Sequence, residues 1–241
     1  DGFSGKARSL NGTSDYISVG TSALVANTTT MTIETWFKTS ASGVGAQYTF
    51  YSEGNTANST NYHILYMRQD QSYALTFERS ANGGGSVVSI NSSVTGLNDG
   101  NWHYGAIVRS AANSWTLYVD GVSSGTSSSS PLTATINDVS LGSLGQSGRG
   151  TYLNGSIDEV RISNTTRTAD EIRQAYEIGK RTHPITIDFV SSPQVAYSSG
   201  TSVTINNPYG TTALTNTLSV GDTIIFKENV NGTETVSQAA I

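Results

Sequence analysis

Asp158 and Glu159 are adjacent carboxylates, the residue type that glycosidases use for acid–base chemistry. Retaining glycosidases use two carboxyl groups about 5 Å apart, one as nucleophile and one as acid. The segment 157–160 alternates like a strand, in which neighbouring side chains point to opposite faces. Glu34 has no second carboxylate in its segment, and no Gly-x-Ser-x-Gly, His-Glu-x-x-His or phosphate-loop motif occurs. We therefore expect the chain not to be an enzyme.

Three other residues could bind a ligand. Arg149 and Tyr152 lie in a Gly- and Ser-rich segment and together offer a hydrogen-bonding fork and an aromatic face for a sugar. Trp115 follows a polar turn, so it is less firmly a core residue than Trp36 and Trp102. The alternative is that Arg149 and Tyr152 are solvated loop residues and that Trp115 packs inside. The candidate loops of this rim are 53–61, 80–86 and 145–152.

Short alternating segments must position these side chains. Nine segments, among them MTIETWF, YHILYM and WTLYVD, alternate apolar and polar residues between Gly, Asn and Ser clusters. Their spacing predicts an antiparallel sandwich rather than a βαβ protein. Asp99-Gly100 and Asp120-Gly121 stand between such segments, where Asp-Gly favours a tight hairpin turn. The expected fold is an all-β, antiparallel, two-sheet sandwich.

One short segment, 169–178, reads as a helix that closes this sandwich. Thr168 is the expected N-cap, and Glu171 stands at the capping-box position. The residues that follow return to strand-like alternation, but fewer than about sixty residues without a disulfide bury little surface. We therefore expect a sandwich domain over 1–182 and a small β-rich segment over 183–241. That segment is either immunoglobulin-like or incomplete and in need of a partner.

The composition excludes several classes of function. Only 13% of the residues are charged, the formal net charge is −5, and no Lys/Arg run occurs. Nothing is present to neutralise a phosphate backbone or an anionic bilayer, so we expect neither nucleic-acid binding nor membrane insertion. The chain has no cysteine, which excludes disulfides and thiolate metal sites. A polar but weakly charged β-protein of this kind is typical of secreted or cell-surface proteins.

Five segments occur in an order that resembles a known family. They are GKARSLNGTSDYISV, MTIETWFKTS, DGNWHYGAIVR, WTLYVDGVSSG and LNGSIDEVRISNTTRTADEIRQAYE, between residue 2 and about residue 180. Together they are similar to laminin G-like domains of the concanavalin A-type lectin/glucanase class. The resemblance implies a jelly-roll fold with a terminal helix.

The resemblance also implies a structural cation. Domains of this kind often hold Ca²⁺ near the meeting point of the first and last strands, where carboxylate and carbonyl oxygens gather. Asp158 and Asp15 are the expected ligands. Asn11 stands where many relatives have an aspartate, which removes one anionic ligand. The alternative is that Asp158 accepts backbone hydrogen bonds and that Asp15 shapes a turn.

Two functions follow from these expectations. The first is a non-catalytic, extracellular binding or adhesion module of a larger surface protein, with a glycan or another cell-surface ligand as its partner. The second is a structural subunit of an extracellular filament, a homo-oligomer in which the C-terminal strands pair with a neighbouring subunit. The chain starts at Asp1 without Met, so we interpret it as a piece of a longer precursor.

Overall fold

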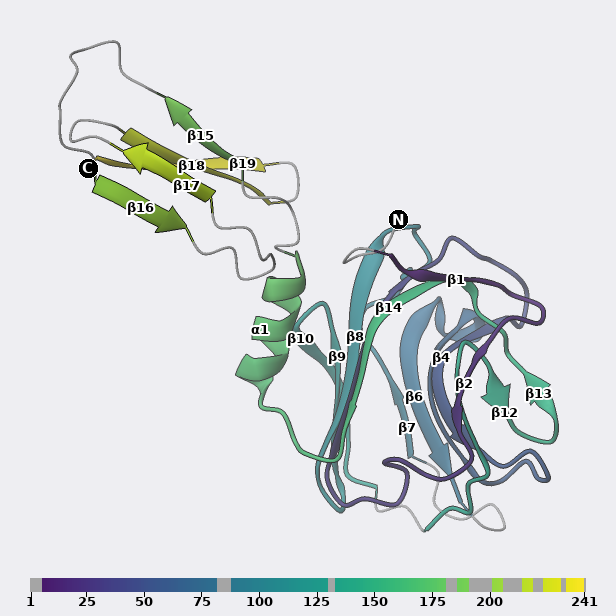
Figure 1. The fold of residues 1–241 in the computed structure, drawn as a ribbon. Helices are drawn as coiled ribbons and strands as arrows, with labels where there is room; N and C mark the ends of the chain where they lie inside the picture. The colour runs from purple at the N-terminus through teal and green to yellow at the C-terminus, as the bar shows by residue number, and fades with distance from the viewer. Residues whose placement is uncertain are drawn as a thin grey trace. The chain divides into compact units, whose positions relative to one another are not determined.

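The computed structural model describes residues 6–81, 88–129 and 133–180, together with the backbone of five strands between residues 186 and 240. The chain divides into two compact units, Asp1–Gly179 and Lys180–Ile241. This division falls three residues before the predicted domain limit. The first unit is a sandwich of two six-stranded antiparallel sheets with one α-helix, as Figure 1 shows. The all-β, two-sheet prediction is confirmed.

Sheet A has the strand order β1-β14-β3-β8-β9-β10. The first and last strands of the unit are neighbours, because β1 pairs with β14 from Arg8 opposite Ile157 to Asn11 opposite Asn154. The register of β14 against β3 shifts between Asp158 and Arg161, which marks a β-bulge. The strands of sheet A are β1 (Arg8–Asn11), β14 (Asn154–Ser163), β3 (Met31–Lys38), β8 (Trp102–Ala111), β9 (Ser114–Val119) and β10 (Val122–Ser127).

Sheet B has the strand order β2-β11-β4-β5-β6-β7. The short strands β12 (Leu144–Gly145) and β13 (Arg149–Gly150) form a hairpin of their own after β11. The strands of sheet B are β2 (Ile17–Gly20), β11 (Asp138–Leu141), β4 (Gln47–Gly54), β5 (Tyr62–Arg68), β6 (Ala74–Ser80) and β7 (Val88–Asn91).

Alternate residues of the two sheets meet in one apolar core. Phe37 of β3 stacks on Phe50 of β4 with ring centroids 4.2 Å apart, and Phe77 of β6 stacks on Trp115 of β9 at 5.2 Å. Leu117 and Val119 also point into this core. Because side chains alternate along a strand, the remaining residues of sheet B face outward. The outward face of sheet B can therefore present side chains to a ligand.

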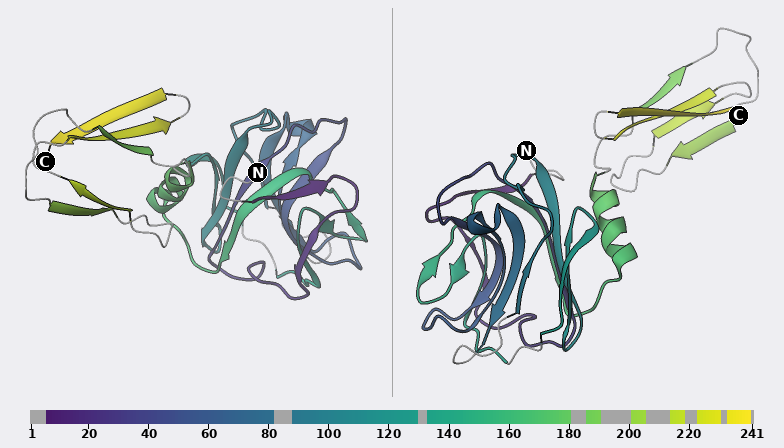
Figure 2. Two further views of the ribbon diagram at one scale, coloured as in Figure 1. Left: turned by 45° about the horizontal axis from the view of Figure 1, so that its top comes forward. Right: turned by 180° about the vertical axis from the view of Figure 1, so that it is seen from behind.

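The outward face of sheet A is covered by α1 (Ala169–Lys180), as Figures 1 and 2 show. Trp36 lies in this layer, 4% exposed, with its ring 5.6 Å from that of Tyr176 on the helix. Trp36 is therefore a core residue, as expected, but it lies in a second apolar layer under the helix and not between the sheets. Ile172 of the helix and Tyr118 of β9 belong to the same cluster. Because Leu117 and Val119 face the inter-sheet core, β9 lies between two packed layers.

The expected helix cap and one of the two expected Asp-Gly hairpin turns are confirmed. The prediction of a hairpin at Asp99-Gly100 is wrong, because this pair lies in the connection from β7 of sheet B to β8 of sheet A. Thr168 Oγ1 accepts a hydrogen bond from the Glu171 amide at 3.2 Å, and the Thr168 amide donates to Glu171 Oε2 at 2.7 Å, which is a capping box. Asp120 and Gly121 have φ angles of 49° and 77° in the turn between β9 and β10. Two positive φ angles match the twist of a tight hairpin. No helix in the described part of the chain is long and apolar enough to cross a membrane.

The described backbone of the second unit forms five strands. A three-stranded sheet has the order β15-β18-β19, and β16 pairs with β17. Whether this unit is immunoglobulin-like or incomplete depends on side chains outside the described residues, so that expectation stays a prediction. The strands are β15 (Thr186–Val190), β16 (Thr201–Ile205), β17 (Leu214–Leu218), β18 (Thr223–Val230) and β19 (Thr233–Ala240).

Candidate functional site

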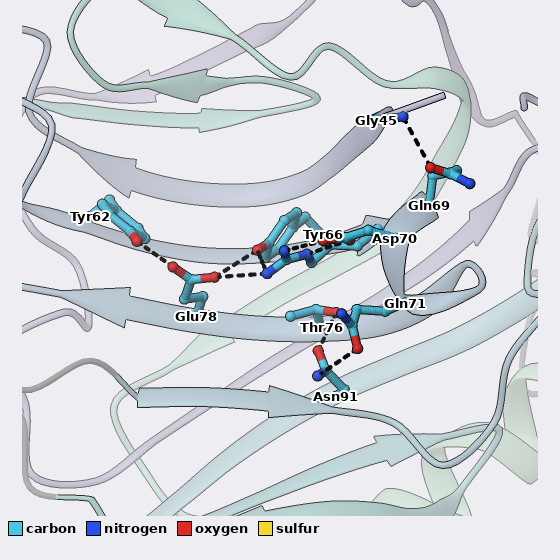
Figure 3. Close-up of polar contacts among 10 residues, drawn as sticks. Gly45, Tyr62, Tyr66, Gln69, Asp70, Gln71, Thr76, Glu78 and Asn91 are labelled. Carbon is cyan, nitrogen blue, oxygen red and sulfur yellow. Dashed lines mark hydrogen bonds and ion pairs between the residues drawn. The ribbon is translucent and has the colours of Figure 1, made fainter. Parts of the chain in front are cut away.

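The outward side of β5, β6 and β7 carries a continuous set of aromatic and polar side chains (Figure 3). Leu65 and Met67 of β5 face the core, so Tyr62, Tyr66 and Arg68 of the same strand face outward. Neighbouring strands and the following turn add the other members. We call this set the polar face; it comprises Tyr62, Tyr66, Arg68, Asp70, Thr76, Glu78 and Asn91.

The carboxylate of Glu78 is the centre of the polar face. Its Oε1 accepts a hydrogen bond from the Tyr62 hydroxyl, and its Oε2 accepts one from the Tyr66 hydroxyl at 2.7 Å. Arg68 Nη1 lies 3.4 Å from Glu78 Oε2 and 3.2 Å from the Tyr66 oxygen. Burial and the neighbouring Glu78 raise the pKa of both tyrosines. Both hydroxyls therefore remain protonated donors to Glu78 at neutral pH.

Arg68 is also held by the turn that follows β5. Its Nε donates to Asp70 Oδ1 at 2.8 Å, and its Nη2 donates to Asp70 Oδ2. These hydrogen bonds from Arg68 hold the pKa of Asp70 below its usual value. The 3₁₀ turn η1 (Gln69–Gln71) places Asp70, and Ser72 closes it with φ 54° by donating its amide to Gln69 O. The guanidinium thus connects a carboxylate in the turn with the tyrosines of the strand.

Asn91 extends the polar face to the edge strand β7. Its Oδ1 accepts a hydrogen bond from the Thr76 hydroxyl at 2.9 Å, and its Nδ2 donates to Gln71 Oε1 at 3.1 Å. Asn91 itself is exposed. Its amide therefore reaches solvent in a fixed orientation.

This arrangement suits the binding of a sugar ring. Tyr62 is partly exposed, and the side chains of Arg68 and Glu78 keep 22% and 17% of their surface accessible. An aromatic side chain can pack against the C–H face of a pyranose, while fixed carboxylate and amide oxygens accept hydrogen bonds from its hydroxyl groups. All side chains except Asp70 come from adjacent strands or strand ends, so they are placed by the sheet.

The hairpin β12–β13 covers the outward side of β11 and β4, and its Leu144 also packs against Tyr62, Ile64 and Tyr66 of β5 at the border of the polar face. Arg149, expected to bind ligand, pairs with Asp138 Oδ1 and donates to Ser140 Oγ at 2.9 Å and Ser143 Oγ at 2.8 Å. Its Cζ also lies 3.9 Å from the ring centroid of Tyr16. The guanidinium therefore links the hairpin to Asp138 and Ser140 of β11. A role in ligand binding would require it to leave these partners.

Two of the three predicted rim loops lie together. The amide of Ser147 donates to Asn58 O at 3.1 Å, and that of Gly148 donates to Thr56 O at 3.0 Å. This joins the segments 53–61 and 145–152 next to Tyr62, which begins β5. Most of the third segment, 80–86, lies outside the described residues. Tyr152 is partly buried, and a role for it in binding stays a prediction.

Trp115, the third predicted ligand-binding residue, is 1% exposed and belongs to the inter-sheet core. Its Nε1 donates to Ser129 O at 2.9 Å. The same residue lines a shallow depression of about 530 Å³ that is otherwise formed by the polar residues 113–116 and 126–129. The indole ring is therefore stacked inside the sandwich and is separated from Arg149 and Tyr152.

The structure does not bring the two expected cation ligands together. Asp158 lies beyond the Arg8 end of the β1–β14 ladder, and Asp15 lies beyond its Asn11 end. At about 3.3 Å per residue, this ladder alone spans about 10 Å, more than a single ion can bridge. Asp158 Oδ1 accepts a hydrogen bond from the Glu159 amide at 2.9 Å. The described residues contain no group of three His, Asp or Glu side chains that could hold a metal.

The residues of the polar face were not predicted from the sequence. YHILYMR was recognised as a strand, and its alternation places Tyr62, Tyr66 and Arg68 on one side. Two tyrosines and an arginine on one face of one strand are a detectable signal. The position of Glu78 opposite Ile64 on the next strand depends on the register between β5 and β6.

Comparisons with known proteins agree with this fold. The model of the concanavalin A-like lectin/glucanases superfamily (Laminin_G_3) matches residues 11–173. The carbohydrate-binding module CBM40 of the Ruminococcus gnavus IT-sialidase is similar, with a TM-score of 0.54 at 15% identity over 68% of this chain and 97% of that module. The same module has been solved with α2,3- and α2,6-sialyllactose. No sequence match was found among curated proteins.

Two further solved structures come from glycan-degrading enzymes. Domain 4 of AbnA, an extracellular GH43 arabinanase from Geobacillus stearothermophilus, was solved with arabinotriose and has a TM-score of 0.54 at 16% identity, over 70% of this chain and 76% of that domain. The NanB sialidase of Streptococcus pneumoniae gives 0.55 at 18% identity, over 97% of this chain and 36% of that one. These likenesses concern the fold, whereas the family model matches most of the chain. The chain belongs to the concanavalin A-like lectin/glucanase superfamily.

Proposed function

We propose that the chain is a non-catalytic carbohydrate-binding module that holds its glycan on the polar face of sheet B. One observation carries this proposal. Tyr62 and Arg68, which are partly exposed, and Tyr66, which is only 3% exposed, converge on the partly exposed carboxylate of Glu78. On sheet A, α1 packs over the outward side chains of β3, β8 and β9, which removes the centre of that face from solvent.

The similar structures support a glycan as ligand. The R. gnavus module was solved with sialyllactose, and the AbnA domain was solved with arabinotriose. Both are domains of enzymes that act on glycans, and each is of similar length to the first unit of this chain. A module of this kind holds an enzyme or a cell surface against its glycan, so we place the protein outside the cell.

Asp158 and Glu159, whose adjacent positions argue against a glycosidase pair, lie away from this face. Asp158 pairs in register with Trp36, whose side chain lies under α1, and Glu159 lies in the β-bulge beside it, 3.1 Å from Arg161. Both belong to sheet A. No described residue favours the filament alternative, which depends on the second unit.

Glycan-array screening of the purified chain tests the proposal, followed by titration calorimetry with the best ligand. We expect Tyr62→Ala to weaken binding at least tenfold, because it removes both the exposed ring and one partner of Glu78. Tyr152→Ala tests the rim-loop site predicted from the sequence, and it should leave affinity within about twofold if the polar face rather than the rim holds the glycan. Tryptophan fluorescence melting verifies that each variant is folded.

The opposite pattern would place the ligand at the rim loops instead. A loss of binding in Tyr152→Ala with none in Tyr62→Ala would refute the polar face as the site. An array on which no glycan is retained would refute the function itself.

A further inference from the structure

The charges around the polar face bear on the kind of glycan that fits it. Over residues 39–101 and 121–160, which supply β4 to β7, β11 and the hairpin, the sequence has three basic residues: Arg68, Arg79 and Arg149. Arg79 is 1% exposed and lies on β6 at a position that faces the core, so two cations remain for the outward side. Three carboxylates, those of Asp70, Glu78 and Asp138, face the same side. The outward side therefore carries a formal excess of one negative charge.

Both cations are already paired. Arg68 makes two hydrogen bonds to Asp70 and further contacts to Glu78 and Tyr66. Arg149 pairs with Asp138 beneath the hairpin, with 18% of its side chain exposed. A carboxylate on a ligand could gain an arginine only by displacing one of these acidic partners. At Arg149 this would leave Asp138, 11% exposed, without its cation, which is costly. At Arg68 it would release only the exposed Asp70, 51% accessible, so the obstacle there is competition with Asp70 together with the like charge of Glu78, which is 17% exposed.

The polar contacts of the face also favour hydroxyl groups as ligands. The Tyr62 and Tyr66 hydroxyls donate to Glu78, and Arg68 makes four hydrogen bonds to Asp70, Glu78 and Tyr66, so all but one of these donors are used within the face. Their lone pairs and those of the carboxylates remain to accept hydrogen bonds. Hydroxyl groups can donate to such oxygens. A carboxylate can only accept, and it would meet oxygens that also accept.

Resting on the proposed function, we propose that the polar face selects neutral oligosaccharides and discriminates against glycans that present a carboxylate, such as those ending in sialic acid. The Arg68–Asp70 ion pair is the element that sets this preference. Asp70 occupies the guanidinium fork that an acidic sugar would need, and Glu78 adds a like charge at the same place.

Matched ligand pairs test the inference. The affinities of the full chain for lactose and 3′-sialyllactose, and for neutral and uronic-acid-bearing oligosaccharides of equal length on an array, are compared at low ionic strength. We expect the neutral member of each bound pair to bind about tenfold tighter or more. Asp70→Asn should free Arg68 and reduce that ratio by about fivefold or more. Asp170→Asn is the control, since it removes an exposed carboxylate paired with an arginine on α1.

Each outcome separates the inference from the proposed function. Tighter binding of the acidic members would overturn the neutral preference and leave glycan binding intact. A neutral preference that Asp70→Asn does not reduce would show that the ion pair does not set it. Binding of neither class would refute the carbohydrate-binding function, and the inference would fall with it.

Discussion

Replacing His63 with leucine should remove much of the acid sensitivity of the first unit. His63 lies on β5 and points into the inter-sheet core, where it is 0% exposed and neither ring nitrogen has a hydrogen-bond partner. Its ring lies 4.8 Å from that of Phe77. Burial, together with the charges of Arg79 and Arg109, holds the pKa of His63 well below its ordinary value of 6.5. The folded protein therefore keeps this histidine neutral.

The sign and size of the effect follow from linkage. In the unfolded chain His63 takes up a proton near pH 6.5, whereas in the folded chain it does not. The full contribution to stability is present above pH 6.5 and is lost as the pH falls toward the folded-state pKa. Each pH unit below 6.5 costs about 1.4 kcal/mol while the folded state stays unprotonated, which is about 2 kcal/mol at pH 5. That is a large share of a typical unfolding free energy of about 5–15 kcal/mol.

Urea unfolding followed by tryptophan fluorescence measures this effect. All three tryptophans lie within the first unit, so the signal reports on the sandwich. His63→Leu should match or exceed the wild type at pH 7.5, because it removes two buried unpaired nitrogens. Its advantage in unfolding free energy should grow by about 2 kcal/mol by pH 5. An advantage that is the same at both pH values would refute the assignment of acid sensitivity to His63.

Three further predictions concern other polar residues. Burial lowers the pKa of His103, but Asp120 and Asp99, 2.9 and 3.1 Å from its ring nitrogens, outweigh burial and raise that pKa. His103→Asn should therefore lose a stabilisation that is complete below pH 6.5 and disappears as the pH rises through the folded-state pKa. Equal shifts of the urea midpoint at pH 6 and pH 9 would contradict this prediction. Glu53 is 0% exposed and accepts hydrogen bonds from the amides of Leu24, Val25 and Ala26 and from the Tyr51 hydroxyl. Glu53→Gln should lower the free energy of unfolding in urea by about 2–4 kcal/mol, because the new amide group would place a donor opposite these donors. Glu177→Gln, at an exposed position, should change the free energy of unfolding little. If Asp158 binds Ca²⁺, a chelator should lower the melting temperature of the wild type and not that of Asp158→Asn; an unchanged wild-type melting curve together with no calcium in elemental analysis would leave Asp158 with its hydrogen bond to Glu159.

The strands were predictable wherever one face is polar. All nine alternating segments of the sequence form strands, because half-buried strands show the two-residue period directly. β4 was missed, although seven of its eight residues are buried. Its outward Ser52 donates a hydrogen bond to Ser143 O beside the hairpin at 2.7 Å, and its inward Glu53 accepts the backbone amides of the loop 24–26. Polar residues on both faces of β4 remove the periodic signal.

The candidate site was less predictable than the strands, because its exposure depends on contacts that are distant in sequence. Arg149 and Tyr66 are both plausible ligand-binding residues by type. Arg149 is engaged because Asp138 lies beneath it on β11, and Trp115 is buried because β9 faces the core. Which face stays open is decided by α1 over sheet A and by the hairpin over part of sheet B. The helix has a local pattern in the sequence, but which sheet it covers and where the hairpin lies depend on contacts that are distant in sequence.

β5 supplies both the polar face and the acid-sensitive core residue, which allows the two roles to be separated by experiment. Tyr62 and His63 are adjacent and therefore point to opposite sides of sheet B. A change at Tyr62 should alter glycan affinity and leave the pH dependence of unfolding as it is, whereas a change at His63 should do the reverse. If both substitutions altered both measurements, the two faces of β5 would be coupled through the strand, and neither experiment alone could assign the site. Independent effects would support the register of β5, because a shift by one residue would exchange the two side chains.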